Sequence, residues 1–340
     1  MIKNILLFLI LFSLFACSDT NEPAKSEPTS AVLNGVTVKY FMYQIQNLET
    51  KANIDLLAAT NYDMLVVEPG FNFTEDPYDV QYLVSKLKTK PDGSRRILLA
   101  YIDIGQAEDY RSYWGNDWKA PTADKRGYPD FMITIDPDGW EGNYPVAFWD
   151  TAWKNIWLGK DALIEKIAQY GFDGVYLDWV EAYDDEKVAA VADAEGVNAP
   201  DEMIKFVSEI RRTGKAINSA FLVIPQNAAY LLNINSVAYS AVIDGIAVED
   251  TWFYGRADAA WNSSNAGDLS GGERHADDYS TANRIKQNKK FLNLGLPVFT
   301  VDYCVKKSNA DYVYQASREN GFIPLVTRVS LSHITETPPF

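Results

Sequence analysis

The chain has few of the residues that bind transition metals or form disulfides. Its 340 residues include two cysteines, Cys17 and Cys304, and two histidines, His275 and His333. There is no HExxH pattern and no Cys/His cluster, which argues against a zinc site. GxSxG is also absent and no histidine lies near Cys304 in sequence, so we expect that thiol to pack rather than react. We expect no metal and no cofactor, while carboxylates alone would still suit magnesium or calcium.

Positive charge is also scarce. The chain has 31 Lys and Arg against 46 Asp and Glu, a formal net charge of -15 at pH 7. This balance argues against nucleic acid as a partner and against adhesion to an anionic membrane surface. A protein with this net negative charge would attract a cationic ligand.

A short apolar stretch opens the chain. Residues 5–12 are apolar, follow Lys3, and lead to Ala16 and Cys17. The stretch is too short to span a bilayer, and a small residue before cysteine is typical of a lipoprotein signal peptide. We therefore expect residues 1–17 to be a signal peptide with lipidation at Cys17. The expected product is an exported bacterial cell-envelope lipoprotein, held at the membrane by its N-terminal lipid only.

The segment after Cys17 differs from the rest of the chain. Residues 18–34 are mostly polar and contain proline, which predicts a flexible tether. With Cys17 lipidated, Cys304 has no partner for an intrachain disulfide. Residues 35–340 show no second linker and suit one α/β barrel or two domains.

Residues 35–340 show a repeating pattern of a short apolar run followed by a helical segment. Eight such units in about 300 residues predict a single (β/α)8 TIM barrel. The alternative, a doubly wound open sheet, would need a glycine-rich turn after the first strand, where the chain has Gln44, Ile45, Gln46 and Asn47. The expected strands are 36–46, 64–67, 97–104, 175–177, 221–224, 245–248, 297–301 and 323–326, with an extra strand at 131–135. The expected helices are 53–60, 80–90, 151–170, 203–217, 278–294 and 310–319.

Polar residues stand where these strands end. In parallel α/β folds the carboxyl ends of the strands share one face. Seven of the expected strands end at or next to a polar or charged residue, here called the strand tip, and five of these tips are carboxylates. For one tip, such as Asp178, a helix cap explains the residue as well as catalysis does. Glu181, three residues later, would cap or form an ion pair with the next segment, or equally contact substrate. Two carboxylates across a cleft are what glycoside hydrolysis requires. The seven tips are Glu68, Asp103, Asp178, Gln226, Glu249, Asp302 and Arg328.

Aromatic residues are abundant, with 9 Trp, 20 Tyr and 16 Phe. Segment 109–150 is a long, aromatic loop of a kind that is unusual without a function. Aromatic rings near the strand tips would stack on sugar, although each ring taken singly is more often part of a core. The stacking candidates are Trp149, Trp179, Trp252 and Tyr303.

Three runs contain the expected strand tips, namely YIDIGQAEDYR at 101–111, GVYLD at 174–178 and VED at 248–250. These runs resemble glycoside hydrolase family 114, the endo-α-1,4-polygalactosaminidases. The resemblance covers nearly all of the mature chain and implies cleavage of α-1,4-linked galactosamine-containing polysaccharide. It also implies Asp178 and Glu249 as the two catalytic acids. One departure stands out, because the family usually has Glu where this chain has Gln106.

The sequence therefore predicts an exported endo-glycosidase acting as a monomer on a cationic amino-sugar polysaccharide. Asp178 would be the nucleophile, or the base in an inverting enzyme, and Glu249 the general acid. The competing hypothesis is a non-catalytic carbohydrate-binding lipoprotein on the same barrel. The expected substrate-binding residues are Glu68, Asp103, Glu108, Trp149, Asp150, Trp179, Gln226, Asn227, Trp252, Asp302, Tyr303 and Arg328.

Overall fold

All eight expected strands are present in the computed structural model, which describes residues 29–70, 79–271 and 279–340. The strands are continuous apolar runs with both faces covered, as is typical of a parallel sheet. Five form a parallel sheet in the order β3 (Phe41–Gln44), β4 (Met64–Val67), β5 (Ile97–Asp103), β8 (Gly174–Asp178) and β9 (Leu222–Pro225). Three form a second parallel sheet in the order β10 (Ile246–Glu249), β13 (Val298–Tyr303) and β14 (Ile323–Thr327).

The two sheets meet between β9 and β10. A single parallel bridge joins Gln226 to Ala247, and the Asn227 N–H donates to the Ala247 carbonyl at 2.9 Å. At the other edges, the Ile45 N–H donates to the Leu331 carbonyl at 3.0 Å, just beyond β3 and β14. Within the described ranges no strand ladder joins β14 to β3. The α/β fold with parallel strands is thus confirmed, and the carboxyl ends of β8, β9 and β10 lie side by side.

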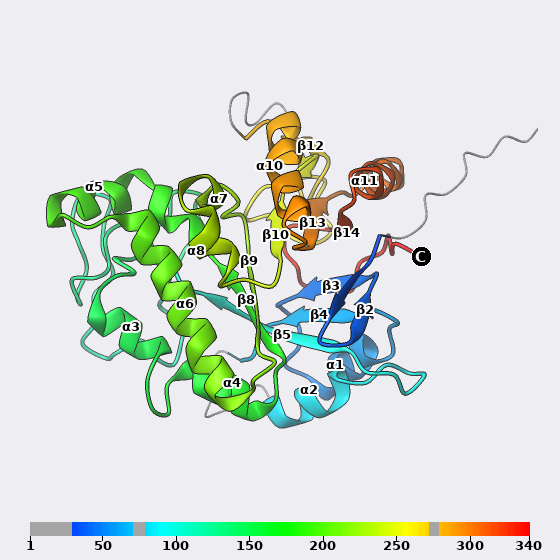
Figure 1. The fold of residues 1–340 in the computed structure, drawn as a ribbon, viewed down its shortest axis with the longest axis horizontal. Helices are drawn as coiled ribbons and strands as arrows, with labels where there is room; N and C mark the ends of the chain where they lie inside the picture. The colour runs from blue at the N-terminus through cyan, green and yellow to red at the C-terminus, as the bar shows by residue number, and fades with distance from the viewer. Residues whose placement is uncertain (1–28, 71–78, 272–278) are drawn as a thin grey trace, which may run out of the picture.

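Helices cover the outer side of the strands (Figure 1). Their starts follow the sequence, because Thr50, Asp79, Asn198 and Ser280 each accept a backbone N–H of the first turn. The helix before β8 ends at Gly171, whose φ of 96° is left-handed. The main helices are α1 (Lys51–Ala58), α2 (Val80–Leu87), α4 (Leu163–Tyr170), α5 (Glu186–Glu195), α6 (Ala199–Ile217), α10 (Thr281–Asn293) and α11 (Lys307–Glu319).

Two expected elements differ in the structure. The helix expected over 151–170 is two helices, α3 (Thr151–Trp157) and α4, because Gly159 and Asp161 adopt positive φ between them. The extra strand expected at 131–135 is absent, since only Met132 makes a bridge, to Val146. The strand of this loop is instead β7 (Asn143–Pro145), which pairs with β6 (Gln106–Glu108). Two short helices, α7 (Leu231–Ile234) and α8 (Ser236–Ser240), were not expected.

The start of the chain also differs. The first expected strand divides into β2 (Val36–Val38) and β3, and β2 pairs with β1 (Ala31–Leu33) in an antiparallel hairpin. The last residues of the expected tether therefore pair with the folded chain. The remaining short elements are the 3₁₀ turn η1 (Val180–Asp184), β11 (Phe253–Tyr254) and β12 (Leu269–Ser270).

Some predictions fall on residues whose structure is not described. The signal peptide with Cys17 and most of the tether lie in 1–28, and His275 lies in 272–278. Among the described helices, none combines the length and apolar character needed to cross a membrane.

Candidate active site

Three neighbouring strands end in the same unusual backbone conformation. Trp179 follows β8 with φ 53°, Asn227 follows β9 with φ 60°, and Asp250 follows β10 with φ 57°. Non-glycine residues seldom adopt positive φ, and such residues gather where a site requires a particular side-chain placement. The turns hold Asp178, Gln226 and Glu249 at one edge of the molecule.

Asp178 ends β8 and is partly exposed. Its Oδ2 accepts a hydrogen bond from the Tyr101 hydroxyl at 2.7 Å, and its Oδ1 accepts from the Trp179 N–H at 2.8 Å. Burial of the carboxyl raises the pKa of Asp178 to about 6, although both hydrogen bonds oppose the shift. The Asp178 carboxylate therefore accepts two hydrogen bonds and is mostly ionised at neutral pH.

Glu249 ends β10 and has more partners. Its Oε2 accepts from the side-chain amides of Gln226 and Asn227, and its Oε1 accepts from the Tyr303 hydroxyl. Burial, with the negative charges of Asp250 and Asp178, raises the pKa of Glu249 to about 8. The two carboxyls are thus electrostatically coupled, and their environments separate their pKa values.

A third acid, Glu181, lies in the same group. It is on η1, and its side chain is hydrogen bonded to Asn227. Burial, reinforced by the charge of Asp178, raises the pKa of Glu181 to about 8. Asp185, not Glu181, caps the next helix, and the Glu181 Oε2 is buried without a hydrogen-bond partner. Of the alternatives for Glu181, the helix cap is therefore absent.

Three buried tyrosines that were not predicted as site residues, Tyr43, Tyr101 and Tyr176, lie near the acids. Tyr43 of β3 packs its ring 6.0 Å from that of Tyr101 and 4.9 Å from that of Tyr176. Burial raises the pKa of each hydroxyl, and the charges of the nearby acids raise it further. Their only sequence signal was an aromatic residue near the end of three expected strands.

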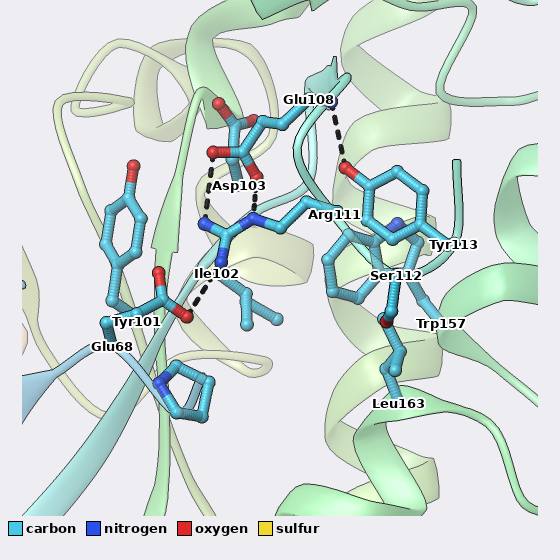
Figure 2. Close-up of a pocket in the computed structure, with 11 residues that line it drawn as sticks. Glu68, Tyr101, Ile102, Asp103, Glu108, Arg111, Ser112, Tyr113, Trp157 and Leu163 are labelled. Atoms are coloured by element: carbon cyan, nitrogen blue, oxygen red, sulfur yellow. Dashed lines mark hydrogen bonds and ion pairs between the residues drawn. The ribbon is translucent and has the colours of Figure 1, made fainter. Parts of the chain in front are cut away.

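A second acidic group lies beside Tyr101 around a small pocket (Figure 2). The buried Arg111 guanidinium lies between two carboxylates, with Nη1 2.8 Å from Glu68 and Nε 2.7 Å from Glu108. Asp103, in register with Asp178, accepts the Gly105 and Gln106 N–H groups through Oδ1, while its buried Oδ2 has no partner. The structure thus brings together the predicted residues Glu68, Asp103 and Glu108, but binds two of them to arginine.

A family model for glycoside-hydrolase family GH114 matches residues 44–339. The chain belongs to this family. Curated relatives of the GH114 chain include an uncharacterized protein of Deinococcus radiodurans, 28% identical over 99% of this chain and 100% of the relative. Another is uncharacterized protein MJ1477 of Methanocaldococcus jannaschii, 32% identical over 88% of this chain and 79% of the relative.

Solved structures resemble the GH114 chain in fold. Aspergillus fumigatus Ega3, in complex with galactosamine, has a TM-score of 0.58 and 14% identity, over 89% of this chain and 98% of Ega3. The glycoside hydrolase domain of PelA from Pseudomonas aeruginosa has a TM-score of 0.54 and 16% identity, over 86% of this chain and 95% of that domain. At these identities the likeness shows the fold, which in these neighbours is a TIM barrel.

Two residues of the GH114 chain that were predicted to bind substrate, Asp150 and Arg328, have structural partners. Asp150 caps α3 by accepting the Ala152 and Trp153 N–H groups. Arg328 pairs with Glu336, donates to the Trp261 carbonyl and lies over the Trp261 ring. These two side chains therefore have a sufficient structural explanation.

Trp252 and Asp302 are also parts of the interior. Both are buried, and Asp302 accepts the Trp252 N–H at 2.6 Å and the Phe253 N–H at 2.9 Å. Burial raises the pKa of Asp302 to about 7. Trp149 and Trp179 remain partly exposed, with Trp149 donating to Glu195 at 2.9 Å, so these two rings are the better stacking candidates.

Gln106 is fully buried, and its side chain bonds to residues other than the strand-tip acids. Its amide donates to Asp136 at 2.6 Å and accepts from Asn143 at 3.1 Å. A neutral amide satisfies a buried carboxylate where a second carboxylate would repel it. This accounts for Gln at the position where the family usually has Glu.

The remaining residues that could bind a metal or react as a thiol, His333 and Cys304, have ordinary packing contacts. In the described part of the chain, no three His, Cys, Asp or Glu side chains are placed to hold a metal ion. His333 bonds to Ser332 and packs on Trp261. Cys304 is buried and unpaired, and burial raises the pKa of its thiol, which confirms that it packs in the interior.

Proposed function

We propose that this GH114 chain is an endo-glycosidase that hydrolyses α-1,4-linked galactosamine-containing polysaccharide. The observation that carries the proposal is the pair of carboxyls at the ends of β8 and β10, with Asp178 bonded to Tyr101 and Glu249 bonded to Gln226, Asn227 and Tyr303. Burial raises the pKa of Asp178 to about 6 and that of Glu249 to about 8. Separated pKa values divide two carboxyls into an ionised group and a protonated group near neutral pH. The resemblance of the fold to Ega3, which was solved with galactosamine, supports the choice of sugar.

In this proposal Glu249 is the general acid. It gives its proton to the glycosidic oxygen as the bond to the leaving sugar breaks. Asp178 is the ionised partner, which either attacks the anomeric carbon or removes a proton from the attacking water. Tyr101 orients Asp178, and Gln226, Asn227 and Tyr303 orient Glu249.

We also propose that the eight strands close as a (β/α)8 barrel. The bridge between β9 and β10 and the hydrogen bond from Ile45 to Leu331 support closure at both junctions of the two sheets. In a barrel the eight strand tips surround one mouth, which would place the aromatic loop 109–150 at its rim.

Hydrolysis is tested with a partly deacetylated α-1,4-galactosaminogalactan and mass spectrometry of the products. Wild-type protein should release long oligomers early, as an endo-acting enzyme does. Asp178→Asn and Glu249→Gln should each lower activity at least about 10³-fold, while Glu186→Gln, an exposed glutamate of α5, should not. All variants should show the wild-type circular dichroism spectrum.

Two results would contradict the proposal. An intact polymer from about pH 4 to about pH 8, with correctly folded protein, would exclude the hydrolase. Binding without cleavage would instead support the non-catalytic carbohydrate-binding protein.

We further propose that the protein is exported and lipidated at Cys17. The basic residue, apolar stretch and small residue before Cys17 support this. In a bacterial host that processes lipoproteins, radiolabelled palmitate should enter the wild-type protein and not Cys17→Ser. Equal labelling of both would exclude Cys17 as the lipid site.

A further inference from the structure

Glu181 has no role in the two-carboxylate mechanism, yet it lies with the two acids. The residue is partly exposed, so a ligand can reach it, whereas its Oε2 is buried without a hydrogen-bond partner. The Asn227 side chain is hydrogen bonded both to Glu181 and to Glu249. Glu181 is therefore held next to the proposed general acid, and no Lys or Arg forms an ion pair with it in the described part of the chain.

A second buried oxygen without a partner lies in the same group. The Tyr176 hydroxyl is inaccessible and makes no hydrogen bond in the described structure. Tyr176 is two residues before Asp178 on β8, so both side chains point to the same face of the sheet. The charges of Glu249, Asp178 and Glu181 all act on this hydroxyl. A buried polar atom left unpaired costs roughly 1 to 3 kcal/mol, so a ligand that supplies the missing bond binds more favourably.

We propose that Glu181, together with the Tyr176 hydroxyl of β8, binds the ammonium group of an amino sugar next to Asp178 and Glu249. The inference rests on the proposed function and deepens it by naming the residue that selects the amino group. An ammonium group carries three N–H donors and a positive charge, so it can bond to both oxygens and neutralise the carboxylate. An N-acetylated sugar offers one N–H and no charge.

Ligand charge and the state of Glu181 are linked. Burial raises the pKa of Glu181 to about 8, so the empty site holds a proton at pH 6. A cation beside the carboxylate favours the ionised form, and binding therefore releases protons. The titratable groups that act on Glu181 or feel its charge are Asp178, Glu249, Tyr176, Tyr183, Tyr239 and Tyr279.

The test compares Glu181→Gln with Glu186→Gln, the same change at an exposed site five residues later. For a deacetylated polymer, Glu181→Gln should raise KM by about 10- to 100-fold with kcat changed less than about 3-fold. For an N-acetylated polymer both values should stay near wild type. Glu186→Gln should match wild type on both. Tyr176→Phe keeps the ring and should give a smaller loss with the same selectivity.

Binding separates this inference from the proposed function. Calorimetry at pH 6 in buffers of different ionisation enthalpy should show that galactosamine oligomers release fewer protons from Glu181→Gln than from wild type. This measurement needs no turnover, so it tests the ammonium site even if the polymer is not cleaved.

Three results would overturn the ammonium site. An equal loss on both polymers would make Glu181 a group that supports the reaction itself. Unchanged KM and proton release in Glu181→Gln would mean that only water bridges the two oxygens. If Glu181→Gln does not fold, Tyr176→Phe with unaltered selectivity overturns it.

Discussion

Asn227 and Glu249 are joined by two hydrogen bonds that run in opposite directions. The Asn227 Nδ2 donates to Glu249 Oε2 at 3.0 Å, and the Glu249 N–H donates to Asn227 Oδ1 at 2.8 Å. The first bond limits rotation of the carboxyl group, and the second fixes the end of β10. Asn227 is thus a positioning residue for Glu249, and its left-handed backbone is part of that arrangement.

Removing this contact should affect both rate and pH dependence. We expect Asn227→Ala to lower kcat about 10- to 100-fold, because the acid is no longer held in line with its target. The hydrogen bond from Asn227 lowers the pKa of Glu249, so its loss should move the alkaline limb of the pH–rate profile to higher pH. Asn233→Ala, at an exposed asparagine of α7, is the matched control. An unchanged profile with reduced kcat would show that Asn227 does not tune the acid.

The activity should have a bell-shaped dependence on pH. Asp178 must be ionised, so kcat/KM should fall as pH drops below about 6. Glu249 must be protonated, so kcat/KM should fall as pH rises above about 8. Glu249 is protonated where Asp178 titrates, so Glu249→Gln should remove the alkaline limb and leave the residual acidic limb near pH 6. Maximal activity near pH 4 would contradict the assignment of roles.

Gln106→Glu should destabilise the protein in a pH-dependent way. The new carboxyl would lie buried against Asp136, and burial with a like charge raises its pKa. A raised carboxyl pKa in the folded state stabilises at low pH, and that stability is lost as pH rises through the folded pKa. We expect a loss of about 2 to 4 kcal/mol near pH 8 and a smaller loss near pH 5. Denaturant unfolding measures both.

The double variant Gln106→Glu/Asp136→Asn tests the cause. It restores a pair of one amide and one carboxyl, so it should recover most of the stability. Failure to recover would point to packing rather than charge.

Arg111→Met should be among the most destabilising substitutions at this site. The change leaves Glu68 and Glu108, both nearly inaccessible, without their cation. Breaking a buried ion pair in this way costs about 3 to 5 kcal/mol, measured by urea unfolding at neutral pH. Arg126→Met removes the half-exposed pair with Glu195 and should cost less than about 1 kcal/mol. Equal losses would falsify the view that Arg111 is structurally essential because it is buried.

Strand positions could be predicted from the sequence because each strand coincides with a short apolar run. Runs such as Met64–Val67 and Ile97–Asp103 are apolar without alternation, which only a strand covered on both faces tolerates. The prediction of helix boundaries failed where a helix ends because of its local backbone conformation. The break between α3 and α4 depends on positive φ at Gly159 and Asp161, and the helical periodicity of the surrounding residues concealed it.

The site residues also differ in how far local sequence could indicate them. Asp178 and Glu249 could be proposed from the sequence because a charged residue at the end of an apolar strand is conspicuous, and the structure places both at strand ends. Glu181 could not be singled out in this way, since its unpaired oxygen depends on what lies around it and not on its neighbours in sequence. Asp150 and Arg328 were placed in the site by position, but their side chains are satisfied by a helix cap and by Glu336.

The sequence by itself determined which segments are strands, which residues end them, and that two carboxylates stand at the ends of β8 and β10. Tertiary structure alone decided which partners each carboxylate has. Arg111 binds Glu68 and Glu108, whereas Asp178 and Glu249 receive hydroxyl and amide donors. The physical reason is that the ionisation of a carboxyl depends on burial and on partners distant in the chain, such as Tyr303 for Glu249, and no local pattern encodes them.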